Sequence, residues 1–164
     1  MKTLMEKDLF QRTLRRLAHE IVEQHLQLDQ LVLVGILNKG FRLAQLLQGL
    51  ILEIQGKEIP VYPLEIRPYR DDEKQNVHVP TQTFTVEKKI ILLVDDVLYT
   101  GRSVRAGIDA IMAMGRPALI RLVVLIDRGH RQIPIRPDVV GKNIATNYFD
   151  LVEVNFESET VTIK

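Results

Sequence analysis

One string constrains the fold of this 164-residue chain more than any other: IILLVDDVLYTGRS, at positions 90–103. Its first five residues are all apolar, which predicts a strand buried on both faces of a sheet. Asp95 and Asp96 end this run, and after a short loop we expect a helix over 103–114. A buried strand, a polar turn and a helix in this order indicate an α/β protein with a mainly parallel sheet.

The same alternation continues in the rest of the chain, which we interpret as a single domain over 1–164. Expected helices cover 7–26 and 41–54, and expected strands cover 31–36, 59–66, 119–126, 139–140, 151–154 and 161–163. Arg121 interrupts the 119–126 run, and Pro60 and Pro63 either place their strand at an edge or make it begin late. The polar stretch that starts at Tyr69 has little periodicity and predicts a loop or a β-ribbon.

Composition excludes several classes of protein. Hydrophobic residues make up 46% of the chain and charged residues 26%, as in globular proteins. No apolar run approaches the roughly 20 residues that span a bilayer, and the charged N-terminal stretch does not resemble a secretory signal. Cysteine is absent, which excludes disulfides and thiolate metal sites. We therefore expect a soluble, cytoplasmic protein, and the net charge of +1 does not by itself indicate nucleic-acid binding.

Three polar turns follow expected strands, at 37–40, 95–103 and 127–131. Ligands of parallel α/β sheets bind outside the carboxyl ends of the strands, where these turns lie. The order of the elements along the chain therefore predicts a binding site built from the three turns.

The turn at 95–103 has the groups that a sugar phosphate requires. Gly101 lets the backbone turn tightly and approach a ligand, and the N–H groups at the start of the following helix favour a phosphate. The hydroxyls of Thr100 and Ser103 can donate to phosphate oxygens. Asp95 and Asp96 can accept from sugar hydroxyls and stabilise a carbon that becomes cationic. Taken singly, these are ordinary strand-end, turn and helix-cap residues, but together they indicate a ligand such as ribose 5-phosphate.

The same string resembles the signature with which type I phosphoribosyltransferases bind 5-phosphoribosyl-1-pyrophosphate (PRPP): an apolar strand, two acids and Thr-Gly-x-Ser/Thr. A wider resemblance covers nearly the whole chain and includes LRRLAHEI, EIRPYRDD and MGRPALIRLVVLIDRGHRQIPIRPDVVGKNIAT. Here the chain is similar to the family of bifunctional pyrimidine operon attenuation regulators and uracil phosphoribosyltransferases, for which DRGHRQIPIR followed by VGKN is the most discriminating part. The resemblance implies a type I phosphoribosyltransferase fold: a mainly parallel central sheet flanked by helices, with a small hood formed by parts of residues 130–164.

The resemblance also implies a reaction, in which uracil and PRPP give UMP and pyrophosphate with Mg²⁺ as the cofactor. Asp95 and Asp96 are the implied catalytic residues, and they contact the ribose hydroxyls. Mg²⁺ would enter with PRPP, with Asp127 as a candidate ligand. The implied PRPP-binding residues are Asn38, Lys39, Gly40, Arg70, Leu98, Tyr99, Thr100, Gly101, Arg102, Ser103 and Arg128. The implied base-binding residues, which act mainly through their backbone, are Val140, Gly141, Lys142 and Asn143.

Members of this family also bind pyrimidine-operon leader RNA through a basic dimer surface, and UMP, UTP or PRPP adjusts that affinity. The matching positions are His19, Arg131, Arg136 and Lys142. The implied assembly is a homodimer or a pair of dimers. A basic surface is what RNA phosphates require. The alternative is that Arg131 and Arg136 hold only the dimer or the fold.

Two segments depart from the family pattern and keep other functions open. Leu37-Asn38-Lys39-Gly40 replaces the usual Lys/Arg-Thr-Arg-Gly of the pyrophosphate loop, which removes a charge and an arginine fork. The segment between Asp72 and Ile90, where the family has a flexible catalytic loop, is shorter than expected. The alternatives are an RNA-binding attenuator with little or no catalysis, a phosphoribosyltransferase for another nucleobase, and a phosphoribosyltransferase-like protein with neither role.

Overall fold

The computed structural model describes residues 1–25, 27–71 and 84–164. Its centre is a five-stranded sheet with the order β3-β2-β4-β5-β6, in which every neighbouring pair is parallel. The strands are β2 (Leu31–Ile36), β3 (Val61–Leu64), β4 (Ile90–Leu98), β5 (Leu119–Asp127) and β6 (Val139–Asn143). The expected α/β class with a mainly parallel sheet is confirmed.

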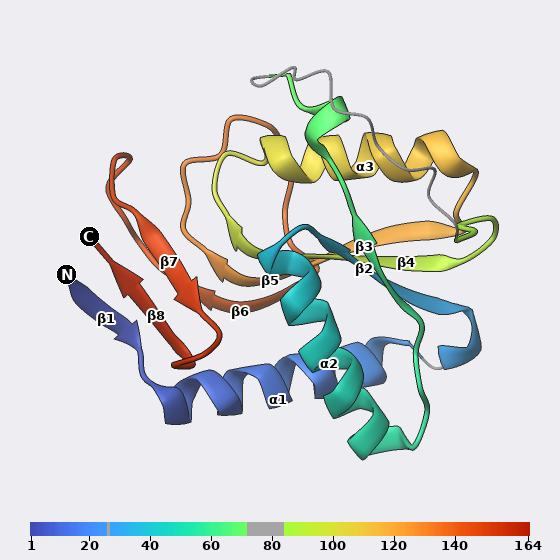
Figure 1. The fold of residues 1–164 in the computed structure, drawn as a ribbon, viewed down its shortest axis with the longest axis horizontal. Coiled ribbons are helices and arrows are strands. Elements are labelled where there is room, and N and C mark those ends of the chain that lie inside the picture. The colour runs from blue at the N-terminus through green and yellow to red at the C-terminus, as the bar shows by residue number, and fades with distance from the viewer. Residues whose placement is uncertain (26, 72–83) are drawn as a thin grey trace.

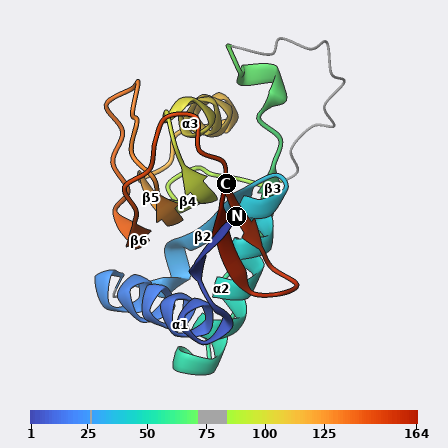
Figure 2. The same ribbon diagram turned by 90° about the vertical axis from the view of Figure 1, so that its left-hand side faces the viewer.

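Helices cover both faces of this sheet. They are α1 (Lys7–Gln24), α2 (Lys39–Gln55) and α3 (Arg102–Met114), with short 3-10 helices η1 (Leu28–Gln30) and η2 (Arg67–Tyr69). α1 and α2 lie on one face and α3 lies on the other, as two perpendicular views show (Figure 1, Figure 2). Leu31 and Leu33 of β2 pack on the α1–α2 side, whereas Val32 and Val34 pack on the α3 side. The run in β2 is continuously apolar because every residue is buried on one face or the other.

A small antiparallel sheet brings the two ends of the chain together (Figure 1). It has the order β1-β8-β7 and consists of β1 (Lys2–Met5), β7 (Val152–Asn155) and β8 (Thr160–Ile163). The sequence pattern does not predict β1, because a run this short cannot be separated from irregular chain by its periodicity. Within 130–164, the range expected for the hood, β7 and β8 belong to this sheet, whereas β6 is an edge strand of the main sheet.

Two strands differ from their predicted forms. β4 continues through Asp95 and Asp96 to Leu98, because its backbone pairing with β5 continues past the apolar run. β5 is not interrupted at Arg121, because the backbone of this residue pairs with Leu92 in register whatever its side chain.

The strand expected at 59–66, β3, begins at Val61, directly after Pro60, and forms one edge of the main sheet. Both predicted consequences of the prolines are therefore present. Most of the polar stretch, residues 72–83, lies outside the described residues, and the prediction of a loop or ribbon there lies outside them too. Within 1–25, 27–71 and 84–164, no helix combines the length and the apolar character needed to cross a membrane.

Candidate active site

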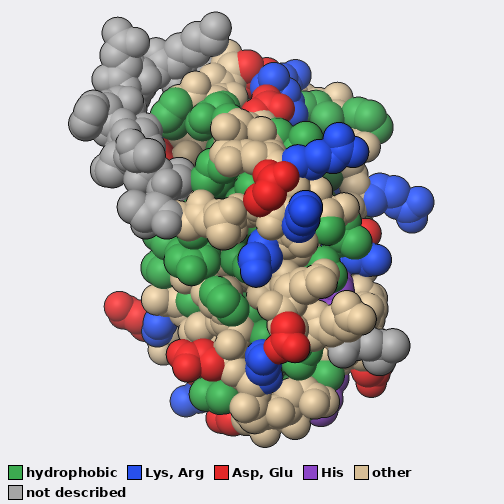
Figure 3. Space-filling view, turned by 90° about the vertical axis from the view of Figure 1, so that its right-hand side faces the viewer, with side chains coloured by type: hydrophobic (Ala, Val, Ile, Leu, Met, Phe, Trp, Pro, Cys, Tyr) green, Lys and Arg blue, Asp and Glu red, His purple; other side chains and the backbone are tan. Residues whose placement is uncertain are grey.

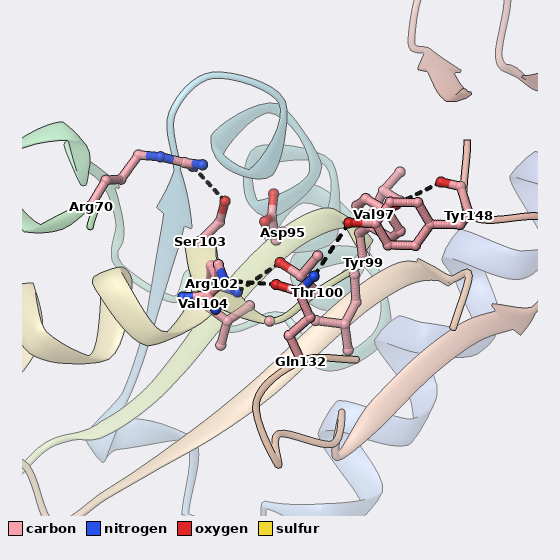
Figure 4. A pocket seen from close by; sticks show the side chains of 12 residues that line it. Arg70, Asp95, Val97, Tyr99, Thr100, Arg102, Ser103, Val104, Gln132 and Tyr148 are labelled. Atoms are coloured by element: carbon pink, nitrogen blue, oxygen red, sulfur yellow. Dashed lines mark hydrogen bonds between the residues drawn. The ribbon is translucent and has the colours of Figure 1, made fainter. Parts of the chain in front are cut away.

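A pocket of about 390 Å³ opens at the carboxyl end of β4, where the strand turns into α3 (Figure 4). It is lined by Arg70, Asp95, Val97, Leu98, Tyr99, Thr100, Gly101, Arg102, Ser103, Val104, Gln132 and Tyr148. The predicted string 98–103 therefore lines one cavity together with Arg70 and Asp95. Gln132 and Tyr148 are not predicted from the sequence, because they come from loops with no regular pattern.

The turn into α3 has the geometry of a phosphate site. Gly101 has φ of 93°, in the left-handed region that favours glycine, and α3 begins at the next residue. The first N–H groups of a helix have no partner within it, so an anion is stabilised at this end. Thr100 accepts from the N–H of Arg102 through Oγ1 at 3.3 Å. Arg70 points at Ser103 and donates from Nη1 to its Oγ at 2.6 Å (Figure 4).

Asp95 is the buried carboxyl group of this pocket, with 8% of its surface exposed. Burial and the neighbouring charge of Asp96 raise the pKa of Asp95, and the guanidinium of Arg70 acts in the opposite direction. The Oδ1 atom of Asp95 accepts from the backbone N–H of Asp96 at 2.9 Å. Asp96 itself does not belong to the lining of the pocket, so the two predicted catalytic acids have different environments. A carboxyl group this buried suits a ligand that brings hydroxyl donors or positive charge.

The guanidinium of Arg102 is already paired with protein groups. Its Nη1 lies 2.7 Å from Oδ2 of Asp71, and its Nε donates to Oε1 of Gln132 at 2.8 Å. Gln132 in turn donates from Nε2 to the hydroxyl of Tyr148 at 3.3 Å. These contacts join the segment after η2, the loop after β5 and the loop between β6 and β7 around the pocket.

The turn at 37–40 packs through Gly40 against β4 at Val94 and Asp95. A Cβ atom on Gly40 would lie 2.4 Å from the carbonyl oxygen of Val94, so a side chain at this position cannot be accommodated without a shift of the backbone. Lys39 donates from Nζ to the carbonyl oxygen of Val154 in β7 at 2.8 Å. The turn is therefore fixed between β4 and the small sheet, and its predicted PRPP-binding residues lie outside the lining of the main pocket.

A second cavity, of about 290 Å³, lies where β5 and β6 end. It is lined by Asp127, Gly129, Arg131, Asn143, Ile144 and Ala145. Asp127 accepts from the N–H of Gly129 at 3.1 Å and from Nη2 of Arg131 at 2.7 Å. The predicted metal candidate Asp127 and the predicted base-binding residue Asn143 thus share one cavity, at paired positions of adjacent strands.

The other predicted base-binding residues lie along β6 outside this cavity. Arg16 of α1 donates to the carbonyl oxygen of Val140 at 3.4 Å and to that of Gly141. The side chain of Lys142 is exposed. The carbonyl groups of Val140 and Gly141 are therefore engaged by α1.

Arg131, predicted to bind RNA, is turned into the fold. Besides its ion pair with Asp127, it donates to the carbonyl oxygen of Ile135 at 2.8 Å and to that of Tyr99 at 3.0 Å. Its side chain is 23% exposed. This geometry favours the alternative in which Arg131 holds the fold.

The remaining predicted RNA-binding side chains, His19, Arg136 and Lys142, are exposed. His19 comes from α1 and Lys142 from β6, two elements that contact each other. On the face drawn in Figure 3, Lys and Arg side chains are interspersed with Asp and Glu and do not form a field of one sign.

The described residues offer magnesium too few side-chain ligands for a site built from protein groups alone. Among the residues that the structure describes, no group of three or more His, Cys, Asp or Glu side chains could hold a metal ion. Mg²⁺ takes about six oxygen ligands in octahedral geometry, so most of them would come from a bound pyrophosphate and water. Asp127 fits one position, because a carboxylate has about four lone-pair sites and this one accepts from Gly129 and Arg131.

Known proteins share both the sequence and the fold. The phosphoribosyl transferase domain family matches residues 2–158. The chain is 50% identical to the bifunctional protein PyrR of Pelotomaculum thermopropionicum, over 94% of this chain and 88% of that one. It is 44% identical to the bifunctional protein PyrR of Haemophilus influenzae, over 96% and 93% of the two chains. The hypoxanthine phosphoribosyltransferase of Trypanosoma cruzi has the same fold, with a TM-score of 0.80 at 18% identity over 99% of this chain and 95% of that one. The chain therefore belongs to the PyrR family, within the proteins that have a phosphoribosyl transferase domain.

Proposed function

We propose that this protein transfers the phosphoribosyl group of PRPP to uracil. In this reaction the bond between C1′ and the pyrophosphate oxygen breaks, the bond between C1′ and N1 of uracil forms, and N1 loses its proton. The observation that carries the proposal is the pocket at the end of β4, where the buried carboxyl group of Asp95 lies beside a helix start suited to a phosphate.

The turn at 99–103 binds the 5-phosphate. Its N–H groups and the hydroxyls of Thr100 and Ser103 donate to phosphate oxygens, and Arg70 supplies positive charge beside Ser103. Asp95 accepts from the ribose hydroxyls, and its negative charge stabilises C1′ as this carbon becomes cationic. Asp96 adds to this negative field from just outside the lining of the pocket.

The leaving group and the base occupy the sides of the site away from α3. Pyrophosphate lies toward the turn at 37–40, where Lys39 supplies charge, and uracil lies toward the cavity that Asn143 lines. Mg²⁺ bound with PRPP neutralises the pyrophosphate and makes it a better leaving group. Asp127, in the same cavity as Asn143, is the protein carboxylate that suits this ion.

A second function, binding of pyrimidine-operon leader RNA, is supported by the exposed basic side chains of His19, Arg136 and Lys142. Two relatives are named bifunctional, which supports a second activity alongside transfer. In a homodimer, two copies of these three side chains would contact more RNA phosphates than one copy can. Arg131 contributes to this surface only through the loop that it holds in place.

The experiment that tests the enzyme is pyrophosphate release from PRPP and Mg²⁺ with uracil, compared with orotate, hypoxanthine, guanine and xanthine. We expect release with uracil alone, its loss in Asp95→Asn and its retention in Arg105→Gln. Arg105 is a matched control, because it is exposed on α3, pairs with Asp109 at 3.1 Å and lies outside the pocket. If pyrophosphate is released with a different base, that base takes the place of uracil in the proposal. No release with any base, despite PRPP binding, would leave RNA binding as the function.

A further inference from the structure

Arg128 lies just after β5, and only 5% of its surface is exposed. Its Nη1 donates to the carbonyl oxygen of Asp150 at 2.6 Å, and its Nη2 donates to those of Asn147 at 2.9 Å and Tyr148 at 3.3 Å. All three acceptors belong to one turn, 147–150, which the N–H of Asp150 closes on the carbonyl oxygen of Asn147 at 3.1 Å. The terminal nitrogens of Arg128 therefore donate hydrogen bonds to the backbone of a single turn.

The same guanidinium lies over the ring of Tyr99, with its carbon 4.1 Å from the ring centroid. A guanidinium over an aromatic face is attracted by the negative charge of that face. Tyr99 also donates from its hydroxyl to the carbonyl oxygen of Tyr148 at 2.6 Å. Arg128 and Tyr99 thus hold the 147–150 turn from two sides, and Tyr99 belongs to the loop that leads from β4 to α3.

This arrangement fixes the side chain of Tyr148 at the pocket. Tyr148 lines the cavity, and its ring centroid lies 5.5 Å from that of Tyr99 (Figure 4). Its hydroxyl accepts from Gln132 at 3.3 Å. A phenol can donate and accept at once, so the proton of this hydroxyl remains available for a ligand oxygen. Arg128, by contrast, does not belong to the lining of the pocket.

We infer that Arg128 is a positioning residue that holds the 147–150 turn on Tyr99, so that the hydroxyl of Tyr148 donates to bound PRPP. The inference rests on the proposed PRPP site, and it replaces the direct PRPP contact expected for the Arg128 side chain. Lysine cannot take over this role, because an ammonium group has the charge of arginine but not the planar fork that reaches several carbonyl groups.

The experiment is a double-mutant cycle on PRPP affinity, measured by calorimetry in the presence of Mg²⁺ and without a base. We expect Arg128→Gln and Tyr148→Phe each to weaken binding about tenfold, the effect of one or two lost hydrogen bonds. The double variant should also lose about tenfold, because the first substitution already displaces the hydroxyl that the second removes. Arg128→Lys should bind as weakly as Arg128→Gln, and the control Arg105→Gln should bind like the wild type.

If the double variant binds PRPP about a hundredfold more weakly than the wild type, the two side chains act independently of each other. That result would overturn the inference, and so would an Arg128→Lys variant that binds PRPP as well as the wild type. If Arg128→Gln does not fold, Tyr99→Phe replaces it in the cycle, because it keeps the ring under Arg128 and removes only the hydroxyl that holds Tyr148. Additive losses in that cycle would also overturn the inference. If the wild-type protein binds no PRPP, the proposed function itself is wrong. If the wild type binds PRPP and the variants bind it equally well, only the proposed role of Arg128 is wrong.

Discussion

Arg70 and Ser103 are joined across the pocket by a hydrogen bond of 2.6 Å from the guanidinium to the hydroxyl oxygen. Arg70 follows η2 on the β3 side of the sheet, and Ser103 lies in the first turn of α3. The bond places a cation beside a helix start that already favours anions. A phosphate bound there would meet the helix, the hydroxyl and the guanidinium together.

The first prediction concerns this bond. Ser103→Ala removes both the acceptor for Arg70 and a donor to the ligand, so we expect KM for PRPP to rise about tenfold. The melting temperature should change little, because Ser103 is only partly buried. Steady-state kinetics with uracil measure the effect, and Ser103→Thr, which keeps a hydroxyl, is the matched control. Equal losses in the two variants would mean that the hydroxyl is not the group that matters.

Asp95 should lower the stability of the folded protein at neutral pH. Because burial raises its pKa in the folded state, the folded protein binds this proton more tightly than the unfolded chain does. The stabilising contribution is therefore full below the unfolded pKa, near 3.9, and is lost as the pH rises through the folded pKa. Asp95→Asn should raise the free energy of unfolding at pH 7 by about 1 kcal/mol while abolishing pyrophosphate release.

Urea denaturation at pH 4 and pH 7 measures this effect. The gain in Asp95→Asn should be larger at pH 7 than at pH 4, since the unfolded chain ionises this carboxyl group above about 3.9, whereas burial opposes its ionisation in the folded protein. A variant that is less stable than the wild type at pH 7 would show instead that Arg70 stabilises the ionised carboxylate by more than its burial costs.

Two glycines of α2 should respond to alanine in opposite directions. Gly40→Ala places a Cβ 2.4 Å from the carbonyl oxygen of Val94, and we expect it to destabilise the fold by about 2–3 kcal/mol. Gly49 has nothing within 4 Å of the equivalent position, and Gly49→Ala should stabilise the helix by about 0.5–1 kcal/mol. Thermal melts of the two variants measure the contrast, and a tolerated Gly40→Ala would contradict the close packing of the 37–40 turn on β4.

Substitutions of Arg131 and Arg136 should have different effects, the first on the stability of the fold and the second on RNA binding. Arg131→Gln removes three interactions within the fold, so we expect a loss of about 2 kcal/mol in the free energy of unfolding. Arg136→Gln should leave the melting temperature unchanged and weaken binding of pyrimidine-operon leader RNA, with a shallower dependence of affinity on salt. Gel-shift titrations at two salt concentrations test this, and unchanged affinity in Arg136→Gln would remove this residue from the RNA-binding surface.

The core of the site could be predicted from the sequence because its residues are contiguous. An apolar strand, Asp95, Gly101 and Ser103 occur within one string, and local physics is sufficient to link them to a phosphate and a sugar. Gln132 and Tyr148 could not be predicted in the same way, since they reach the pocket from separate loops whose positions depend on tertiary contacts. The inward orientation of Arg131 could not be predicted either, because a basic residue in a polar loop has the same sequence pattern whether it faces solvent or the fold.

The pairing of β1 with β8 sets an order of events during synthesis. Residues 2–5 are made before every other strand of the two sheets, but their strand partner, 160–163, is made after all of them. The carbonyl oxygen of Val154 that receives Lys39 is also made late. A growing chain can therefore assemble the main sheet, β2 to β6, while β1 is still unpaired, and the 37–40 turn gains its hydrogen bond to the small sheet only after β7 has been made.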